Sequence, residues 1–397
     1  MTLLRGRVVG GLDRRDDGRG HPALPTETLD SLVIGGGQAG LAASFFLQER
    51  GIDHVVLDAN PAPGGAWQHR WDSLTMEDVH GVADLPAAPA PARSNRRANQ
   101  VIPAYFGEYE RRHRLPVVRP VHVTRVEADG DLLLVHAGER RWRTRTLVNA
   151  TGTWTRPFVP YYPGITSFTG EQLHTVAFPG AEHFRDKRVL VVGGGASAVQ
   201  FLGELAPVTD TLWVTRRPPV WRDDDFDFEA GLAAVTRVEE RVRRGLPPAS
   251  VVSVTGLALR TQERRAAELG AYVRRPMFAV IEPGGARWAD GSFESVDVIL
   301  WATGFRAAVD HLAPLGLRSP QGGIALVQVP GNVQGATTAV RDPRVQLVGY
   351  GPSASTVGAS RAGRAAAAAV VRHLARTAAA HHQRGRDLEA RLALHQQ

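Results

Sequence analysis

Glycine residues recur in the sequence at a spacing that suits the binding of a dinucleotide. Gly35, Gly37 and Gly40 follow an apolar segment and open a pattern typical of a helix. The first glycine permits a tight turn, the second lets the backbone approach a pyrophosphate, and the third lets the helix pack closely on the strand. Free N–H groups at the start of the helix also favour a phosphate. Asp58 lies 18 residues after Gly40, at the end of the next apolar segment. Its carboxylate can accept hydrogen bonds from a ribose, so residues 32–58 predict a dinucleotide-binding unit.

A second copy of this pattern follows later in the chain. Gly193 and Gly195 repeat the turn, and Ala198 takes the place of the third glycine, which is an accepted variant. Arg216 lies 23 residues after Gly193, the same separation as between the first glycine and the acid of the first copy. A guanidinium at this position, with Arg217 next to it, suits a 2′-phosphate because it makes charge-assisted bidentate hydrogen bonds. The alternative is a solvated strand end, since arginine is often simply exposed.

Elements that would position these turns can be placed by apolar periodicity and turn residues. Each turn lies between two strands and opens a helix. The other predicted elements are strands at 117–126, 132–136, 141–148, 296–301 and 345–348, helices at 103–113 and 360–379, and a hairpin at 277–289. The strands at 141–148 and 296–301 end in the same tripeptide, Ala-Thr-Gly. Residues 1–28 have no periodicity, which predicts a disordered leader.

Composition excludes several classes of protein. The chain has 397 residues, 43% of them hydrophobic, which predicts two globular domains. It has no cysteine, which excludes a disulfide framework, a cysteine-ligated zinc site and a redox-active cysteine pair. No segment is apolar enough to predict a membrane span or a signal peptide, so a cytoplasmic location is expected.

Charge points to neither nucleic acid nor a metal ion. The net charge is +7 and the pI is about 10.4, but the arginines are scattered along the chain rather than grouped in a band. We therefore expect no nucleic-acid partner. The three acids at 223–225 suit a solvated loop better than a metal site, because no further ligand pattern accompanies them.

The segment between the two glycine turns carries a family pattern. Phe168, Gly170, His174 and Phe178 have the spacing Phe-x-Gly-x-x-x-His-x-x-x-aromatic. This resembles the fingerprint of the flavin-containing and Baeyer–Villiger monooxygenases, the class B flavoprotein monooxygenases, in which it also precedes the second glycine turn. The glycine turns, the fingerprint and the second Ala-Thr-Gly tripeptide occur in the order of that family. The resemblance therefore covers about residues 30–375.

Two segments that contain tryptophan indicate which members of the family the chain resembles most. The family also implies a domain architecture. Residues 64–67 and 71–74 resemble the short bacterial members and the plant indole-pyruvate type. The implied fold class is α/β, with two Rossmann-like dinucleotide-binding domains and the NADPH domain inserted into the FAD domain. The FAD domain would then comprise 29–160 and 290–397, and the NADPH domain 161–289. The absence of cysteine separates the chain from disulfide reductases of the same architecture, which pass electrons to a cysteine pair.

We expect the residues that bind the two cofactors to lie in the glycine turns, in the tryptophan segments and at strand ends. They are Gly35, Gly37, Gln38, Ala39, Gly40, Asp58, Gly65, Trp67, Trp71, Val121, Ala150, Thr151, Gly152, Gly193, Gly195, Ser197, Ala198, Arg216, Arg217, Ala302, Thr303, Gly304, Gly349 and Tyr350.

Two histidines are the candidate catalytic residues. The resemblance implies that His174 lies at the junction of the domains and affects domain motion and nicotinamide placement. Amine-oxidising members carry an asparagine, which helps to hold the peroxyflavin, in the loop after the tryptophan segment. The corresponding loop here, 75–81, has no asparagine, and His80 is the candidate replacement. For each histidine the alternative is a surface or loop residue without a catalytic role.

The resemblance implies an NADPH-dependent reaction with dioxygen. NADPH would reduce FAD, and the reduced flavin would form a C4a-(hydro)peroxide that inserts one oxygen atom into a small organic substrate. The reaction would be N- or S-oxygenation or attack on a carbonyl. Two alternatives stay open: an NADPH oxidase or flavin-linked reductase without oxygen transfer, and a non-catalytic flavin-bound interaction module. A homodimer is possible, and no membrane partner is expected.

Overall fold

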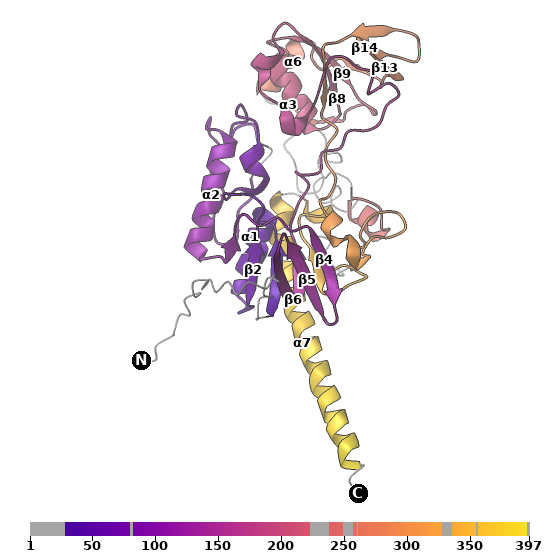
Figure 1. Cartoon of the computed structure of the whole chain (residues 1–397). Helices are drawn as coiled ribbons and strands as arrows, with labels where there is room; N and C mark the ends of the chain where they lie inside the picture. Colours follow the sequence, from indigo (N-terminus) through magenta and orange to yellow (C-terminus); the bar gives the residue numbers. More distant parts are fainter. Residues whose placement is uncertain are drawn as a thin grey trace, which may run out of the picture.

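The protein folds into two α/β domains, each built around its own sheet (Figure 1). This computed structural model describes residues 28–79, 82–222, 238–248, 257–259, 261–327, 336–354 and 356–394. The predicted fold class is confirmed, because both sheets have a parallel core of strands connected by helices. The predicted leader (except Thr28), His80 and the acids at 223–225 lie outside the described residues.

A seven-stranded sheet organises the first domain. Its parallel strands are β3 (Val117–Val118), β2 (His54–Leu57), β1 (Leu29–Ile34), β6 (Arg140–Asn149) and β17 (Val345–Leu347). Two antiparallel strands extend it, β5 (Leu132–Ala137) and β4 (Arg125–Asp129). β6 is long enough to pair with β5 along its first half and with β17 along its second half. The sheet therefore unites segments from both ends of the chain.

Two helices cover one face of this sheet. α1 (Gln38–Gln48) follows the first glycine turn, and α7 (Thr356–Leu394) is the last helix of the chain. The two helices approach closely at Gly363. A Cβ added there would lie only 2.7 Å from the backbone nitrogen of Ala43. Beneath them the valines of the sheet are fully buried. In Figure 1 the far part of α7 extends beyond the body of the domain.

The opposite face of the first sheet is covered by a segment that includes η4 (Asp310–Leu315). Leu312 and Ile324 pack there against Leu32 and Leu133 of the strands. Beside the sheet, α2 (Ala98–His113) packs on the short helix η1 (Gly65–His69) and buries its apolar side chains, Ile102, Phe106 and Tyr109. Both faces of the sheet are therefore shielded from water, which explains its continuous apolar strands.

The second domain has a five-stranded parallel sheet. Its strands, in spatial order, are β12 (Arg274–Arg275), β9 (Asp210–Val214), β8 (Arg188–Val192), β16 (Val298–Trp301) and β7 (Glu171–His174). The helices α3 (Ala196–Leu205) and α6 (Thr261–Glu268) pack together beside it, and both belong to one apolar cluster with the strands. A second apolar cluster, rich in aromatic side chains, contacts the alternate side chains of the sheet, such as Leu190 and Val192. The antiparallel strands near it are β13 (Val280–Glu282), β14 (Gly285–Arg287) and β15 (Phe293–Ser295).

The return from the second domain to the first lies later in the chain than the expected position at 290. β16 pairs with both β8 and β7, so residues 298–301 form an inner strand of the second sheet. All four side chains of β16 are buried, as expected for a strand between two neighbours. The expected boundary at 289/290 is therefore corrected: residues 290–301 belong to the second domain by their pairing.

Several predicted elements have different limits in the structure. The predicted strand at 117–126 is divided into β3 and β4, with a cis peptide bond between Arg119 and Pro120 in the interval. The predicted helix at 103–113 starts earlier, at Ala98, and the helix at 360–379 extends from Thr356 to Leu394. Among the described residues, no helix combines the length and the apolar character that crossing a bilayer requires.

Candidate functional site

The first glycine turn fits tightly against the end of β6. A Cβ at Gly35, where φ is +104°, would lie 2.5 Å from the carbonyl oxygen of Ala150. A Cβ at Gly40 would lie 1.9 Å from the carbonyl oxygen of Gly35. No other residue type fits at these two places, because the added carbon would overlap backbone atoms. The turn is therefore held at the carboxyl ends of β1 and β6, where ligands bind in such sheets.

The second glycine turn has the same construction. A Cβ at Gly193 would lie 2.2 Å from the carbonyl oxygen of Ala302, which follows β16 as Ala150 follows β6. Trp213 Nε1 donates a hydrogen bond of 2.7 Å to the carbonyl oxygen of Gly193 and so anchors the turn to β9. The two Ala-Thr-Gly tripeptides thus have the same role: the alanine carbonyl of each packs against the first glycine of a glycine turn.

The middle glycine of each turn has space that a ligand could use. A Cβ at Gly37 or at Gly195 would meet no atom within 4 Å. Gly37 and Gly195 are the N-caps of α1 and α3, and neither cap makes a side-chain hydrogen bond. The first N–H groups of both helices thus lack a side-chain cap and carry the positive end of the helix dipole. Both places fit a pyrophosphate, and the two cofactors expected from the sequence match them in number.

Asp58 is close to the first turn but is already engaged by a neighbouring arginine. Its side chain is only 4% exposed, and Oδ2 accepts a hydrogen bond of 3.0 Å from Arg119 Nε. Arg119 also donates to both carboxylate oxygens of Glu110, at 2.7 and 2.6 Å. Burial alone would lower the pKa of Arg119, but the two carboxylates raise it above its ordinary value. A Cβ at Gly36 would lie 2.8 Å from Asp58 Oδ2 and 2.9 Å from Arg119 Nη2, so both groups border the turn.

Arg119 is a site residue that sequence reasoning missed. It borders the turn because β3 pairs with β2, which places Val118 beside Leu57. No local signal links residue 119 to residue 58, since the pairing partner of a two-residue strand cannot be inferred from its sequence.

The two arginines after β9 are exposed to solvent. Arg216 and Arg217 are exposed, and within the described part of the chain neither makes an ion pair. A third arginine, Arg274 on β12, lies beside them: its Nε donates to the hydroxyl of Thr215 at 2.7 Å. Arg274 was also missed by sequence reasoning, because β12 joins β9 only through the fold.

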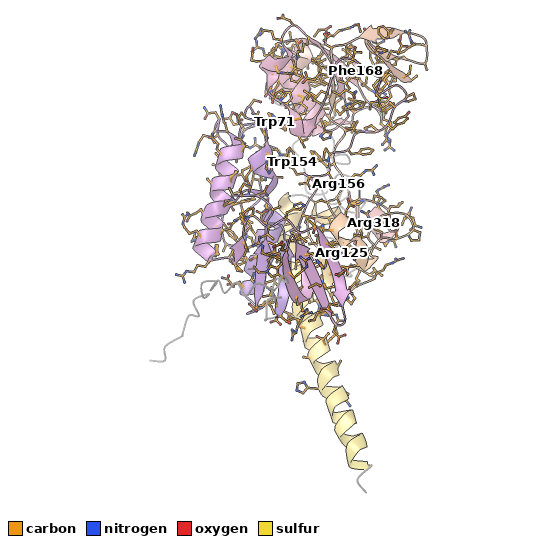
Figure 2. All side chains as sticks on the ribbon, in the orientation of Figure 1. Trp71, Arg125, Trp154, Arg156, Phe168 and Arg318 are labelled. Carbon is orange, nitrogen blue, oxygen red and sulfur yellow. The ribbon has the colours of Figure 1, made fainter. Side chains whose placement is uncertain are left out.

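The chain crosses between the domains twice, and the two crossing segments pair with each other. Phe158 N donates to the carbonyl oxygen of Gly304 at 3.0 Å, and Arg306 N donates to that of Arg156 at 2.9 Å. In Figure 2 the labelled Trp154 and Arg156 lie between the two domains. The connection is therefore a short antiparallel ribbon and not two independent linkers.

His174 is bound to this ribbon. Its Nε2 donates to the carbonyl oxygen of Gly304 at 3.0 Å, and its Nδ1 accepts from Val176 N at 3.4 Å. His174 as a whole residue is 8% exposed, and its ring meets that of Phe305 edge-on at 5.1 Å. Burial lowers the pKa of His174, which the bond to Gly304 offsets only in part. Both ring nitrogens are used by the neutral form, so the geometry favours a linkage role.

Trp71 and Ser73 contact the second domain through one half-buried carboxylate. Trp71 Nε1 donates to Glu204 Oε1 at 2.9 Å, and Ser73 Oγ donates to Oε2 at 2.6 Å. The indole of Trp71 also packs on Phe201 at 4.8 Å, and Gln200 Nε2 donates to the carbonyl oxygen of Asp78 at 2.8 Å. The structure thus places Trp71, expected to bind a cofactor, against α3. We call the contact of Trp71 and Ser73 with Glu204 the Glu204 clasp.

A cavity of about 460 Å³ lies next to the Glu204 clasp, between the two domains. It is lined by Trp71, Asp72, Ser73, Arg97, Phe178, Pro179 and Gly180. Its walls come from the tryptophan segment and the start of α2 in the first domain, and from the end of the fingerprint segment.

The other predicted residues lie on the elements that form or adjoin the two turns. Gly65 packs on the first turn, since a Cβ there would lie 2.9 Å from Gly37 Cα. Gln38 and Ala39 begin α1, and Ala39 faces Gly349. Val121 N donates to the carbonyl oxygen of Asp58. The remaining residues expected at the first turn are Trp67 on η1, Thr151 and Gly152 after β6, and Tyr350 after β17. Those of the second turn are Ser197 and Ala198 on α3 and Thr303 and Gly304 after β16.

Comparison with known proteins identifies the family. The sequence profile of the family described as pyridine nucleotide-disulphide oxidoreductase matches residues 32–255, more than half of the chain. The chain also resembles the solved flavin-containing monooxygenase from Stenotrophomonas maltophilia, with 36% identity and a TM-score of 0.75, over 88% of this chain and 100% of that one. The chain therefore belongs to this family and is a flavoprotein oxidoreductase of the monooxygenase type, which confirms the resemblance stated from the sequence.

Two further proteins are similar to this chain, one over about half of its length and one over most of it. The uncharacterized oxidoreductase CzcO of Bacillus velezensis is 27% identical over 205 residues, which are 48% of this chain and 59% of that protein. OTEMO in complex with FAD and NADP is 17% identical, with a TM-score of 0.61 over 89% of this chain and 87% of that one. The similarity to OTEMO shows a common fold only. Members of the family bind FAD and NADP(H), as OTEMO does in that complex.

Proposed function

We propose that the protein oxygenates a small organic substrate with dioxygen, using FAD at the first glycine turn and NADPH at the second. One observation carries the proposal: two open, uncapped helix N-termini are followed by different side chains at the place of the ribose. The first has the buried carboxylate of Asp58, and the second has the exposed Arg216 and Arg217. A carboxylate suits a free ribose, and an arginine pair suits a 2′-phosphate.

The side chains of the protein bind and position, and the cofactor supplies the redox chemistry. When bound, FAD would accept a hydride and react with dioxygen, which no side chain of this chain can do. The N–H groups after Gly37 and Gly195 would hold the two pyrophosphates. His174 would hold the crossing ribbon, and with it the orientation of the nicotinamide domain, through its bond to Gly304. The Glu204 clasp would keep the domains in contact from the other side.

The proposal is tested by two measurements on the flavin-loaded protein. Under anaerobic conditions NADPH should bleach the flavin absorbance. In air, NADPH consumption, hydrogen peroxide release and oxygenated product are then measured together for a panel of substrates. Oxygenated product in proportion to the NADPH consumed supports the proposal. Lack of bleaching would contradict it and favour a non-catalytic flavin-bound module.

An NADPH oxidase is the second candidate function. The observation that favours it is the loop after the tryptophan segment, in which Thr75 and Asp78 bond to each other and no asparagine is present. Peroxide that matches NADPH consumption for every substrate would assign the oxidase function and contradict oxygen transfer.

A further inference from the structure

A second cavity lies beside η4, on the face of the first sheet that the segment of η4 covers. Its volume is about 210 Å³, and four of the side chains that line it are apolar: Val309, Leu312, Leu317 and Ile324. All four are buried and belong to the apolar cluster on this face of the sheet. None of the residues expected to bind a cofactor lines this cavity, which we call the η4 cavity. The proposed function therefore gives the η4 cavity no role.

An arginine without an acidic partner stands at the edge of the η4 cavity. Arg341 lines the cavity and is exposed. Its Nη1 donates to the carbonyl oxygen of Gly316 at 2.8 Å, and within the described residues it makes no ion pair. Asp342, the next residue in the chain, is paired with Arg344 at 2.8 Å. A guanidinium has five N–H donors, so Arg341 keeps donors for a ligand.

The second arginine of the η4 cavity shares its acid with another arginine. Arg318 Nη2 donates to Asp310 Oδ1 at 2.8 Å, and Arg156 Nη1 pairs with Oδ2 of the same aspartate at 2.7 Å. None of the described residues that line the cavity is acidic. In Figure 2 the labelled Arg318 lies apart from the labelled Trp71. One carboxylate thus serves two arginines and Arg341 adds a further positive charge, so the edge of the cavity is cationic.

The walls and the charge together favour an amphipathic anion. Burial against apolar walls raises affinity by roughly fourfold for each CH₂ group. A guanidinium binds a carboxylate through charge-assisted, bidentate hydrogen bonds. The cavity is smaller than the roughly 300–1,000 Å³ of pockets for drug-sized ligands, so its ligand is small. We propose that the η4 cavity binds an aliphatic carboxylate of about six to eight carbons, with its chain against Leu312 and Ile324 and its carboxylate on Arg341.

This ligand lies behind the first glycine turn and not in it. Leu312 follows His311, whose Nε2 donates to Asn149 Oδ1, at the end of β6, at 2.7 Å. Ile324 N donates to the hydroxyl of Tyr350, after β17, at 2.8 Å. The cavity therefore shares its supporting segment with the first turn, but the residues that line it are different ones. We expect the carboxylate and FAD to bind at the same time.

Calorimetry on the flavin-loaded full chain tests the proposal. It measures the dissociation constants of hexanoate, butanoate, hexan-1-ol and inorganic phosphate. Hexanoate should bind at least about tenfold more tightly than hexanol, as for a charge-assisted hydrogen bond. It should also bind about 10- to 20-fold more tightly than butanoate, because two more CH₂ groups are buried. Flavin fluorescence recorded during the titration should show no release of FAD.

Two variants locate the site. Arg341→Met should lower the affinity for hexanoate to that for hexanol and leave hexanol unchanged, because only the contact with the charge is removed. Ala313 lines the cavity and is exposed, so Ala313→Phe should fill the cavity without disturbing the core and abolish the binding of both compounds. The control is Arg112→Met, because Arg112 on α2 is also exposed and makes no ion pair within the described residues. It should leave all the dissociation constants unchanged.

Several outcomes would overturn the assignment. They are absence of hexanoate binding at about 10 mM, equal affinity for hexanoate and hexanol, and a preference for hexanoate that survives Arg341→Met. Phosphate that binds as tightly as hexanoate would show a site for ions only, and release of FAD by hexanoate would place the carboxylate at the cofactor. If Ala313→Phe does not fold, Arg341→Met decides alone. The titration needs neither NADPH nor dioxygen, so its result is independent of the proposed function.

Discussion

Asp58 and Arg216 take the same place in the two glycine-turn units but have opposite surroundings. The carboxylate of Asp58 is buried and held by Arg119, whereas Arg216 is exposed and makes no ion pair among the described residues. A fixed carboxylate can accept from a ribose without rearrangement. An exposed guanidinium can turn towards a phosphate that arrives with the ligand. The choice between NADPH and NADH is therefore expected to depend on the arginines.

Replacement of Arg216 by alanine should weaken NADPH selectively. A guanidinium–phosphate hydrogen bond is a charge-assisted one, so we expect the KM for NADPH to rise by about 10- to 100-fold. The KM for NADH should change little, because NADH has no 2′-phosphate. Steady-state flavin reduction with both cofactors measures the effect, with the exposed Arg111→Ala as the control. Equal losses for both cofactors would refute the role given to Arg216.

Two glycine substitutions should separate a binding role from a folding role. At Gly195 an added Cβ meets no atom and φ is −107°, so Gly195→Ala should fold normally. It should nevertheless raise the KM for NADPH by about tenfold or more, or at least ~1.4 kcal/mol, because the methyl group would enter the space of the pyrophosphate. At Gly35 the Cβ would overlap Ala150 and φ is positive.

Gly35→Ala should therefore destabilise the protein itself, by about 2 to 5 kcal/mol from the strained backbone and the overlap. Urea unfolding of both variants, together with NADPH titration, checks the pair. Unfolding of Gly195→Ala, or an unchanged affinity for NADPH, would contradict the assignment of the open space to a phosphate.

At the scale of elements, α3 joins the two domains through the Glu204 clasp. Trp71 and Glu204 lie 133 positions apart in the chain. Within the residues that the structure describes, the carboxylate of Glu204 has no cationic partner. Burial raises the pKa of Glu204 above its ordinary value of 4.5. The folded protein therefore holds this proton more tightly than the unfolded chain does. The contribution of this protonated carboxyl to the free energy of unfolding is fully present below pH 4.5. It is lost as the pH rises through the raised pKa of Glu204.

Glu204→Gln should remove this pH dependence. Glutamine keeps an acceptor for Trp71 Nε1 and cannot ionise, so its stability relative to the wild type should increase as the pH rises. The free energy of unfolding in urea is measured for both proteins at about pH 5 and at about pH 7.5. A difference between the two proteins that is the same at both pH values would show that Glu204 does not titrate in this range.

The order of elements was largely predictable, and their allocation to domains was not. Each glycine turn, its helix and its strands were found because periodicity is a local property. β16 was expected in the first domain, yet it pairs with β8 and β7. An apolar strand of this kind suits the interior of either sheet, and only the packing of the two domains selects one of them.

At the scale of the whole molecule, a half-buried histidine supports the end of β6, against which the first glycine turn packs. His311 Nε2 donates to Asn149 Oδ1 at 2.7 Å, and Asn149 Nδ2 donates to the hydroxyl of Thr151 at 3.0 Å. Burial lowers the pKa of His311 from 6.5 to about 4. The stability linked to this group is present above pH 6.5 and is lost as the pH falls towards 4.

His311→Gln should make the protein less sensitive to acid. Glutamine can still donate to Asn149 but does not take up a proton. The wild type should lose about 3 kcal/mol more than the variant between neutral pH and about pH 4, as an order of magnitude. Unfolding in urea across this range measures the difference. Parallel curves for the two proteins would exclude His311 as the source of acid sensitivity.

Assembly and location remain predictions at this scale. The far part of α7 extends from the body of the first domain (Figure 1), but its residues do not identify a partner. Light scattering of the purified chain would establish whether the chain forms a homodimer. The expected cytoplasmic location is likewise a prediction.

The sequence by itself determined the two dinucleotide turns, their difference at Asp58 and Arg216, and the link between His174 and the domain junction. These features depend on spacing within short segments or on a family pattern, so they are visible before folding. Only the tertiary structure decided that Arg119 holds Asp58 across 61 positions, that Trp71 contacts Glu204 across 133, and that β16 belongs to the second sheet. Contacts of this kind join residues far apart in the chain, and their partners are selected by how sheets and helices pack, not by local sequence.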